Sequence, residues 1–320
     1  MIAIISEAND VHAQAVMSEL DVQGASYRLI DFAQYPVQSS LTIDFEAKRS
    51  GANARWGINK EALNFQDFQV IWWRRPQPFQ IDPYITGAEN KNFTYSESES
   101  ALSGLWLAQD AFWINHPTRT DEAGRKVLQL KIAGELGLII PKTRITNSVE
   151  DAKEFILKIG VEKTVYKAFS GTQQAWRETR ILKPDELELI ANVRYAPVIF
   201  QEYIPAGVDL RITVVGDKIF PAAIHSRGTE YEVDFRMVMG SAAIQETTLP
   251  GNIEKLLLAL MKKLNLVYGA IDMRQTPDGT FVFLEINPAG QWLFIEEATK
   301  QPIAKALAAL MIEKDKQETT

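Results

Sequence analysis

The chain has 320 residues, of which 46% are hydrophobic and 23% are charged, and its formal net charge is −7. This composition is typical of a soluble globular enzyme with two or three domains and argues against a nucleic-acid binder, which would present a basic face. Cysteine is absent, the N-terminus does not resemble a signal peptide, and no stretch approaches the ~20 apolar residues of a membrane span, so we expect a cytoplasmic protein without disulfides.

The first third of the chain predicts a small parallel sheet. The β-α-β opening is Rossmann-like, with Asn9 or Asp10 as the helix cap, but it lacks the G-x-G-x-x-G turn of dinucleotide-binding proteins. Arg74 and Arg75 follow the last strand, and a packed or salt-bridged pair is their default interpretation. The break at 115–117 suggests a domain boundary. The expected strands are 2–5, 27–30 and 70–73, and the expected helices are 10–20 and 88–113.

The rest of the chain alternates between helical and strand patterns. Thr120 is the expected cap of the first helix, which Gly137 ends. The expected helices are 121–136, 148–159, a short one after Pro184, 252–264 and about 292–311. The expected strands are 143–145, 164–168, 198–201, 210–215 and 219–225.

The most informative segment is a predicted hairpin over 268–287, with its turn at 276–279. Strict alternation places Phe281, Phe283, Glu285 and Asn287 on one face of the second strand. If the turn pairs residues 275 and 280, Asp272 lies opposite Phe283, with Glu285 as its diagonal neighbour about 7 Å away. Two carboxylates and an amide oxygen suit Mg²⁺. The alternative is a surface hairpin whose polar face is simply hydrated.

The middle of the chain supplies groups that suit a phosphate ligand. Lys167 ends an apolar strand just before the turn 170–172, whose backbone N–H groups could approach phosphates, and Lys126 lies on the first predicted helix of the middle domain, 121–136. The segment 200–205 indicates a strand that runs into a linker, which offers backbone donors and acceptors at an apolar site. Asp209 and the arginine two residues later alternate outwards on the next strand. Solvated lysines and acidic residues that only flank a loop are the alternatives.

The order of these pieces resembles the ATP-grasp superfamily. The pieces are a small α/β domain, a lysine-bearing middle domain, the linker QEYI (201–204), DLR (209–211) and the ending FLEINPAG (283–290). A narrower resemblance, to the graspetide synthetases that mature microviridin-type peptides, rests on VIWWRRP (70–76), the segment 115–143, DFR (234–236) and FLEINPAGQWLFIE (283–296).

The resemblance implies an α/β (α+β) ATP-grasp fold with three domains. An N-terminal, Rossmann-like pre-ATP-grasp domain would span 1–115, a central domain 116–203 and a C-terminal catalytic domain 204–320. It also implies ATP and Mg²⁺ as cofactors. The metal on the ATP phosphates would be held by Asp272, Glu285 and Asn287.

The same resemblance assigns the nucleotide contacts. The phosphates and the adenine region would be contacted by Lys126 and Lys167. The adenine-binding linker would consist of Glu202, Tyr203 and Ile204, with Asp209 at the ribose.

The substrate side is assigned in the same way. Arg211 would lie close to the phosphates or to the activated carboxylate. The peptide-facing candidates are Asp234, Arg236 and Arg274. A proton could be taken up by an aspartate or by His225, although a lone strand histidine also fits a structural role.

The implied function is the ATP-dependent macrocyclisation of a ribosomal precursor peptide, made of a leader and an acidic core, through ω-ester or ω-amide bonds. The family also suggests a homodimer, and no nucleic-acid or membrane partner is expected. One alternative is an ATP-grasp ligase that adds an amino acid, such as glutamate, to a protein or a small acceptor. Another is a non-catalytic peptide-binding module that recruits a leader.

Overall fold

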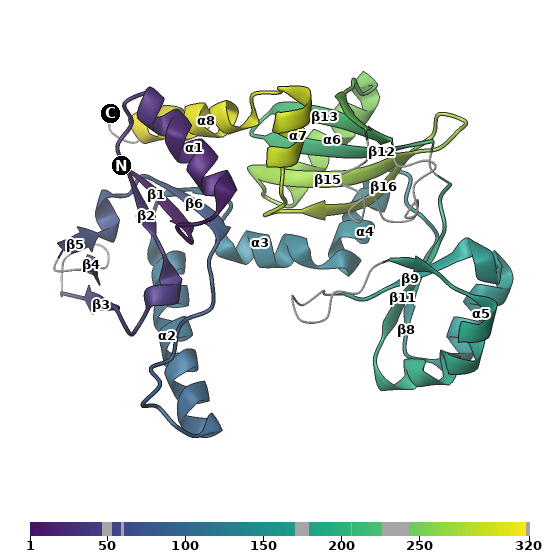
Figure 1. Cartoon of the computed structure of the whole chain (residues 1–320), viewed down its shortest axis with the longest axis horizontal. Helices are drawn as coiled ribbons and strands as arrows, with labels where there is room; N and C mark the ends of the chain where they lie inside the picture. Colours follow the sequence, from purple (N-terminus) through teal and green to yellow (C-terminus); the bar gives the residue numbers. More distant parts are fainter. Residues whose placement is uncertain (47–52, 59–60, 170–178, 206, 226–242, 318–320) are drawn as a thin grey trace.

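The computed structural model describes residues 1–46, 53–58, 61–169, 179–205, 207–225 and 243–317. Within these residues the strands form four sheets (Figure 1). Buried hydrophobic residues form separate cores around them. No helix in the described ranges is long and apolar enough to cross a membrane.

The N-terminal sheet is parallel, in the order β2-β1-β6-β7. All five residues of β1 are buried, which is typical of a parallel strand that is covered on both faces. Asp10 caps α1, because its Oδ1 accepts the Ala13 N–H at 2.8 Å. The bounds are β1 (Ile2–Ser6), α1 (Val11–Val22), β2 (Tyr27–Ile30), β6 (Val70–Arg75), α2 (Ala88–Ala108) and β7 (Phe112–Ile114).

Two features of this part differ from the sequence prediction. The helix expected over 88–113 ends at Ala108, and 112–114 form a strand that pairs with β6. A small antiparallel sheet that the sequence did not predict packs beside α2, with Trp56 and Phe65 in the shared core. Its strands are β3 (Ser39–Asp44), β4 (Asn53–Ile58) and β5 (Glu61–Asn64).

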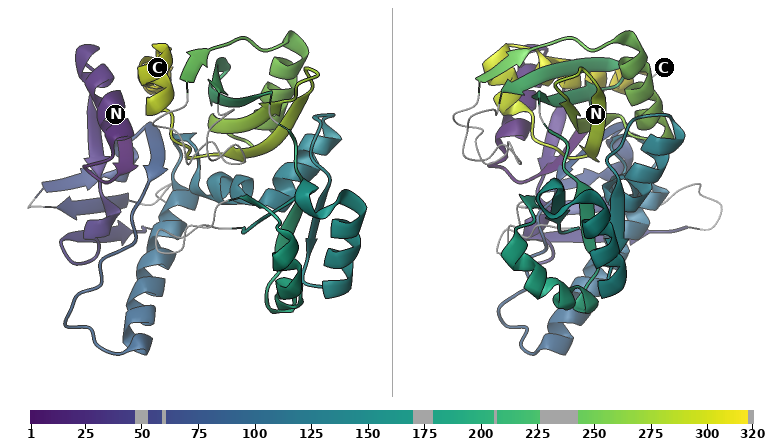
Figure 2. Two further views of the ribbon diagram at one scale, coloured as in Figure 1. Left: turned by 45° about the vertical axis from the view of Figure 1, so that its right-hand side comes forward. Right: turned by 90° about the vertical axis from the view of Figure 1, so that its right-hand side faces the viewer.

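The central sheet is antiparallel and carries α5 and the 3₁₀ segment η4 on a core of its own. Figures 1 and 2 show it as a separate lobe beside the C-terminal sheet. In sheet order its strands are β10 (Arg180–Ile181), β9 (Thr164–Lys167), β11 (Val198–Glu202) and β8 (Thr143–Thr146), with α5 at Val149–Ile159 and η4 at Pro184–Tyr195.

The C-terminal sheet is antiparallel and has the order β14-β13-β12-β15-β16. One face packs on α6 and on residues of α3 and α4, and the other packs on α7 and α8. The bounds are α3 (Pro117–Gly124), α4 (Lys126–Glu135), β12 (Val208–Val215), β13 (Lys218–His225), β14 (Ala243–Glu246), α6 (Gly251–Lys263), β15 (Tyr268–Gln275), β16 (Phe281–Asn287), α7 (Leu293–Thr299) and α8 (Ile303–Gln317).

Two helices that the sequence predicted as continuous are each broken. The helix expected over 121–136 is two helices, because Arg125 between them has an extended backbone; His116, and not Thr120, caps α3. The last helix breaks at Lys300, whose φ is 62°, before Pro302 restarts it. The second piece, α8, packs against α1 in one core with the N-terminal sheet.

Candidate active site

The two predicted carboxylates lie directly opposite each other on β15 and β16. Asp272 pairs with Glu285, while Met273 pairs with Phe283, so Leu284 is the extra residue of a β-bulge. The register predicted from the sequence, with Asp272 opposite Phe283, is therefore wrong. The extra residue also reverses the alternation, so Phe283 faces the core while Glu285 stays on the Asp272 side. The pairing of Gln275 with Phe281, and not with residue 280 as the sequence suggested, supplies the rest of the shift, and together the two changes place the carboxylates closer than the diagonal arrangement would.

Each carboxylate has its own cation. Lys126, at the start of α4, forms an ion pair with Glu285. Arg211 of β12 donates from Nη1 to Asp272 Oδ1 at 2.6 Å, and both side chains are buried. Burial lowers the pKa of Arg211, but the nearby Asp272 carboxylate outweighs this effect and raises the pKa. The guanidinium therefore stays charged.

The loop 287–292, which follows β16, is held by donors from the N-terminal sheet. Arg74 is buried and donates from Nη1 to the carbonyl oxygen of Ala289 at 2.8 Å, and its Nε lies 3.4 Å from Asp10. Arg75 donates to the same carbonyl at 3.3 Å. The expected packed, salt-bridged role of the arginine pair is thus confirmed for Arg74, and both residues also fix this loop.

The loop also packs closely on β15. Tyr268 donates its hydroxyl to the Gly290 carbonyl at 2.8 Å, and burial raises the pKa of this tyrosine to about 12, so it remains a donor. A Cβ at Gly290 would lie 2.4 Å from the Cβ of Ala270, so only glycine fits here. Asn287, which is exposed, accepts the Ala289 N–H at 3.0 Å.

Asn115, which sequence reasoning treated only as part of a break, is a buried clamp on this loop. It donates from Nδ2 to the Tyr268 and Pro288 carbonyls at 2.8 and 3.0 Å. Its Oδ1 accepts the N–H groups of Val267 and Tyr268 at 2.7 and 3.0 Å. The available signal was an asparagine directly after an apolar strand.

Gln129, which sequence reasoning also missed, holds β16 from the other side. It donates to the Ile286 carbonyl at 2.8 Å and accepts the Ile286 N–H at 3.1 Å. The side-chain amide thus replaces a neighbouring strand at this edge. A glutamine on the buried stripe of a helix was the signal that could have identified it.

The predicted linker residues lie together at the end of β11. The N–H groups of Glu202 and Tyr203 donate to the carbonyls of Lys142 and Lys163, each at 2.8 Å. Glu202 also forms an exposed 3.4 Å ion pair with Lys142. Lys167 ends the neighbouring strand β9, which pairs with β11. The turn 170–172 lies outside the described residues.

Arg274 joins this linker to the C-terminal sheet. It donates from Nη1 to the Ile204 carbonyl at 2.8 Å, and its guanidinium lies 5.9 Å from the centre of the Tyr203 ring. Its Nε donates to Asp209 Oδ1 at 2.7 Å, and both side chains are buried. The expected ribose and substrate contacts of this pair stay predictions.

The remaining predicted site residues have no contact with the carboxylates or the linker among the contacts described above. Asp234 and Arg236 lie outside the described residues. His225 is exposed at the end of β13, where its Nε2 lies 2.6 Å from Nε2 of Gln245.

The donor set fits a magnesium ion. Within the described ranges no three His, Cys, Asp or Glu side chains are placed to share a metal. Mg²⁺, however, takes one or two carboxylates and completes its shell with other oxygens. Asp272 and Glu285, with the amide of Asn287 on the same strand, are side chains of this kind and would be the ligands if a magnesium ion bound here.

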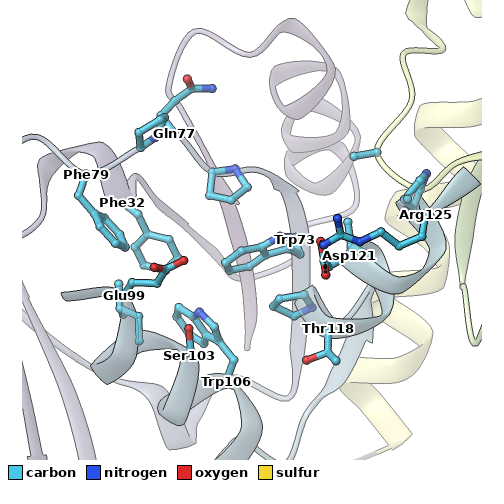
Figure 3. A pocket seen from close by; sticks show the side chains of 18 of the residues that line it. Phe32, Trp73, Gln77, Phe79, Glu99, Ser103, Trp106, Thr118, Asp121 and Arg125 are labelled. Atoms are coloured by element: carbon cyan, nitrogen blue, oxygen red, sulfur yellow. Dashed lines mark hydrogen bonds and ion pairs between the residues drawn. The ribbon is translucent and has the colours of Figure 1, made fainter. Parts of the chain in front are cut away.

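A cavity of about 1010 Å³ opens beside the carboxylates. Its lining includes Lys126 and Asn287, together with Pro288 and Ala289, and most of the remaining residues come from the end of β6 and the segment after it, from α2 and from α3. Figure 3 shows several aromatic rings that face this space.

Two family models match the chain. Residues 123–311 match the RimK-like ATP-grasp domain, and residues 1–121 match the MvdD pre-ATP-grasp domain. The chain belongs to the RimK-like ATP-grasp family. This ATP-grasp ligase therefore has the predicted fold class, and its membership of the superfamily is confirmed. ATP-grasp ligases use ATP. The domain limits proposed from the sequence stay a prediction.

Two solved structures resemble this ATP-grasp ligase over nearly its whole length. The macrocyclase MdnC from Microcystis aeruginosa MRC, bound with its precursor peptide MdnA, is 28% identical and has a TM-score of 0.87, covering 98% of this chain and 99% of that one. A Chryseobacterium gregarium RiPP-associated ATP-grasp ligase, in complex with ADP and a leader and core peptide, is 27% identical and has a TM-score of 0.88, covering 98% and 96%.

A more limited similarity connects the ATP-grasp ligase to a different activity. A Shewanella sp. (strain W3-18-1) protein named probable alpha-L-glutamate ligase 1 is 29% identical over 204 residues. The match covers 62% of this chain and 64% of the relative, so the chain spans less than two thirds of that protein's length.

Proposed function

We propose that this ATP-grasp ligase macrocyclises a ribosomally made precursor peptide by forming ω-ester or ω-amide bonds between side chains. The main support is the similarity over 98% of the chain to two ligases that were solved with precursor peptides. The glutamate-ligase similarity covers 62% of the chain.

The carboxylates and their cations suit the first chemical step. Asp272, Glu285 and Asn287 would hold Mg²⁺, which would supply positive charge beside the ATP phosphates. Lys126 pairs with Glu285 in the described structure and could turn to the phosphates once the metal balances this carboxylate. Arg211, already charged beside Asp272, would neutralise the reacting oxygens.

The linker side would position the nucleotide. Glu202, Tyr203 and Ile204 would contact the adenine, and Asp209 the ribose, while Lys167 would reach the phosphates. The bond from Arg274 to the Ile204 carbonyl fixes the end of this linker. Arg274 therefore has a structural role in the linker, and an experiment on this residue has to distinguish that role from substrate binding.

The reaction has two balanced steps. A side-chain carboxylate of the peptide attacks the γ-phosphorus of ATP; the bond to ADP breaks and an acyl phosphate forms. A serine or threonine hydroxyl, or a lysine amine, of the same peptide then attacks the acyl carbon. The bond to phosphate breaks, and the nucleophile gives up its proton. Asp234, His225 or the leaving phosphate could accept that proton, and Arg236 could contact the acidic core. Each ring removes one water from the peptide.

Mass spectrometry tests this proposal directly. The full chain is incubated with ATP, Mg²⁺ and the short precursor encoded beside its gene, and ADP release is measured in parallel. We expect a product lighter by whole multiples of one water. A product heavier by an amino acid would instead support a ligase of the glutamate-adding kind. Bound peptide with neither ADP nor a mass change would indicate a binding module.

A matched pair of variants completes the test. Glu285→Gln keeps the size of the side chain but removes the charge, and we expect ADP release to fall by more than about 100-fold. Glu313→Gln alters an exposed glutamate on α8 and should leave the rate unchanged. A cytoplasmic location and a homodimer stay proposals, and size measurement in solution would test the second.

A further inference from the structure

The cavity that Lys126 and Asn287 help to line has a wall rich in aromatic residues, and we call it the aromatic cavity (Figure 3). Its volume, about 1010 Å³, is at the upper end of ligand pockets and could hold a peptide segment with its side chains. The aromatic residues that line it are Phe32, Trp73, Phe79, Tyr95, Trp106 and Phe169.

The aromatic wall is preformed. The ring centres of Trp73 and Trp106 lie 5.6 Å apart and those of Phe32 and Trp106 lie 5.1 Å apart, while Phe79 and Tyr95 are separated by 5.2 Å. These separations are typical of favourable aromatic pairs. A ligand therefore meets rings that already support one another and need little ordering.

The rim of the aromatic cavity leaves apolar side chains in water. The exposed fractions of Leu107, Phe169 and Tyr95 are 71%, 41% and 37%. All three residues line the same cavity. Apolar groups gathered around one hollow are typical of a binding surface, because a ligand that covers them removes their contact with water.

The charged residues that line the aromatic cavity differ in whether they are paired. At the aromatic end Glu99 forms no ion pair with any described residue, whereas Asp121 is paired with Arg125 at 2.7 Å. Lys126 and Asn287, which belong to the candidate active site, also line the cavity. A peptide carboxylate is therefore disfavoured near Glu99.

We propose that the aromatic cavity is a specificity pocket that takes a bulky apolar side chain, preferentially aromatic, close to the reacting carboxylate of the peptide substrate. The inference rests on the proposed function and adds the side-chain class that the ligase selects. Its physical basis is that Lys126 and the aromatic residues line one and the same cavity. An uncharged, ring-shaped side chain fills that wall without placing a like charge beside Glu99.

Two synthetic peptides probe the pocket. They are acetyl-Thr-Phe-Glu-Asp-amide and the same peptide with glycine in place of phenylalanine, each assayed with the full chain, ATP and Mg²⁺. We expect kcat/KM for ADP release to be about tenfold or more higher for the phenylalanine peptide, because its ring leaves water. Equal values for the two peptides would overturn the proposal.

Variants at the rim separate the pocket from a general effect. Leu107→Asp and Tyr95→Ala change exposed side chains and should reduce the preference for phenylalanine towards one. Leu157→Asp is the matched control, because Leu157 is 80% exposed on α5 and does not line the cavity. A preference that survives both rim variants, or that falls equally in the control, would contradict the pocket.

A readout that needs no turnover keeps the two proposals distinct. A peptide with p-benzoylphenylalanine in place of phenylalanine is irradiated on the protein, and the labelled residues are identified by mass spectrometry. We expect labels at Phe79, Tyr95 or Leu107. Labels there without ADP release would refute the proposed function and keep the pocket, whereas ADP release with labels only elsewhere would do the reverse.

Discussion

The two sides of the candidate active site are built differently. The carboxylate side, which comprises β15, β16 and the loop 287–292, is held by buried donors such as Arg74, Asn115 and Gln129. The linker side, which comprises the β8–β11 sheet and residues 202–204, has its own core, and its ion pairs, such as Lys142 with Glu202, lie largely at the surface. The N-terminal sheet and α4 thus fix the backbone that carries the carboxylates, whereas the central sheet has a core of its own.

The largest loss of stability is expected from the carboxylate side. Asn115→Ala leaves two N–H groups and two carbonyls near Tyr268 and Pro288 without the side-chain amide. Because each buried unsatisfied group costs about 1–3 kcal/mol, the free energy of unfolding should fall by about 3–5 kcal/mol, measured by urea denaturation. Asn90→Ala, which removes one exposed bond to the Thr86 carbonyl, is the control and should cost less than about 0.5 kcal/mol. Similar losses in both variants would remove the distinction between the two sides.

A smaller, pH-dependent effect is expected from His12, which packs under the same loop with its ring centre 5.0 Å from that of Trp292. Burial, reinforced by Arg74, lowers the pKa of His12 from 6.5 to about 4. Below pH 6.5 the unfolded chain gains a proton that the folded chain does not bind. The stability contributed by neutral His12 is therefore present above pH 6.5 and is lost as the pH falls towards 4, by about 3 kcal/mol.

The variant His12→Phe isolates this contribution. Its ring keeps the contact with Trp292 but cannot take up a proton. Between pH 6.5 and 4 the free energy of unfolding of the variant should therefore rise relative to that of the wild type. Urea titrations at a series of pH values measure the difference, which cancels the carboxylates that both proteins share. Parallel profiles would show that His12 is readily protonated in the fold.

The smallest effect is expected on the linker side. Lys142→Ala removes an exposed ion pair with Glu202, and such pairs contribute little because water screens both charges. The free energy of unfolding should change by less than about 0.5 kcal/mol. A loss above about 1 kcal/mol would mean that this sheet depends on its surface charges more than the comparison allows.

The sequence predicted the order of most strands and helices, and it placed Asp272 and Glu285 close together on one hairpin, where the structure pairs them; the role of these residues and Asn287 as metal ligands stays a prediction. It failed where a local pattern has two solutions. Alternation in FVFLEI fits a regular strand as well as a bulged one, because Phe283 and Leu284 are both apolar. The helical spacing over 121–136 likewise carries no sign of the extended residue Arg125.

The long-range contacts were not predictable for a different reason. Asn115 and Gln129 act on backbone groups more than a hundred residues away, and neither their spacing nor their chemistry specifies that partner. The pairing of Arg74 with the Ala289 carbonyl has the same origin. Such bonds depend on how whole sheets pack, which no window of sequence contains.

The single extra residue in β16 decides which face of the sheet each following side chain of the strand occupies. If β16 were regular, with Leu284 in the ladder and Phe283 still in the core, the strand would turn Glu285 towards the apolar interior and present Ile286 to the ligand side, although every chemical group would be retained. The spacing between the turn and Asn287 is therefore as much a determinant of this site as the identity of its ligands. A hairpin in which every residue of β16 joined a regular ladder would keep its strands but turn Glu285 away from Asp272.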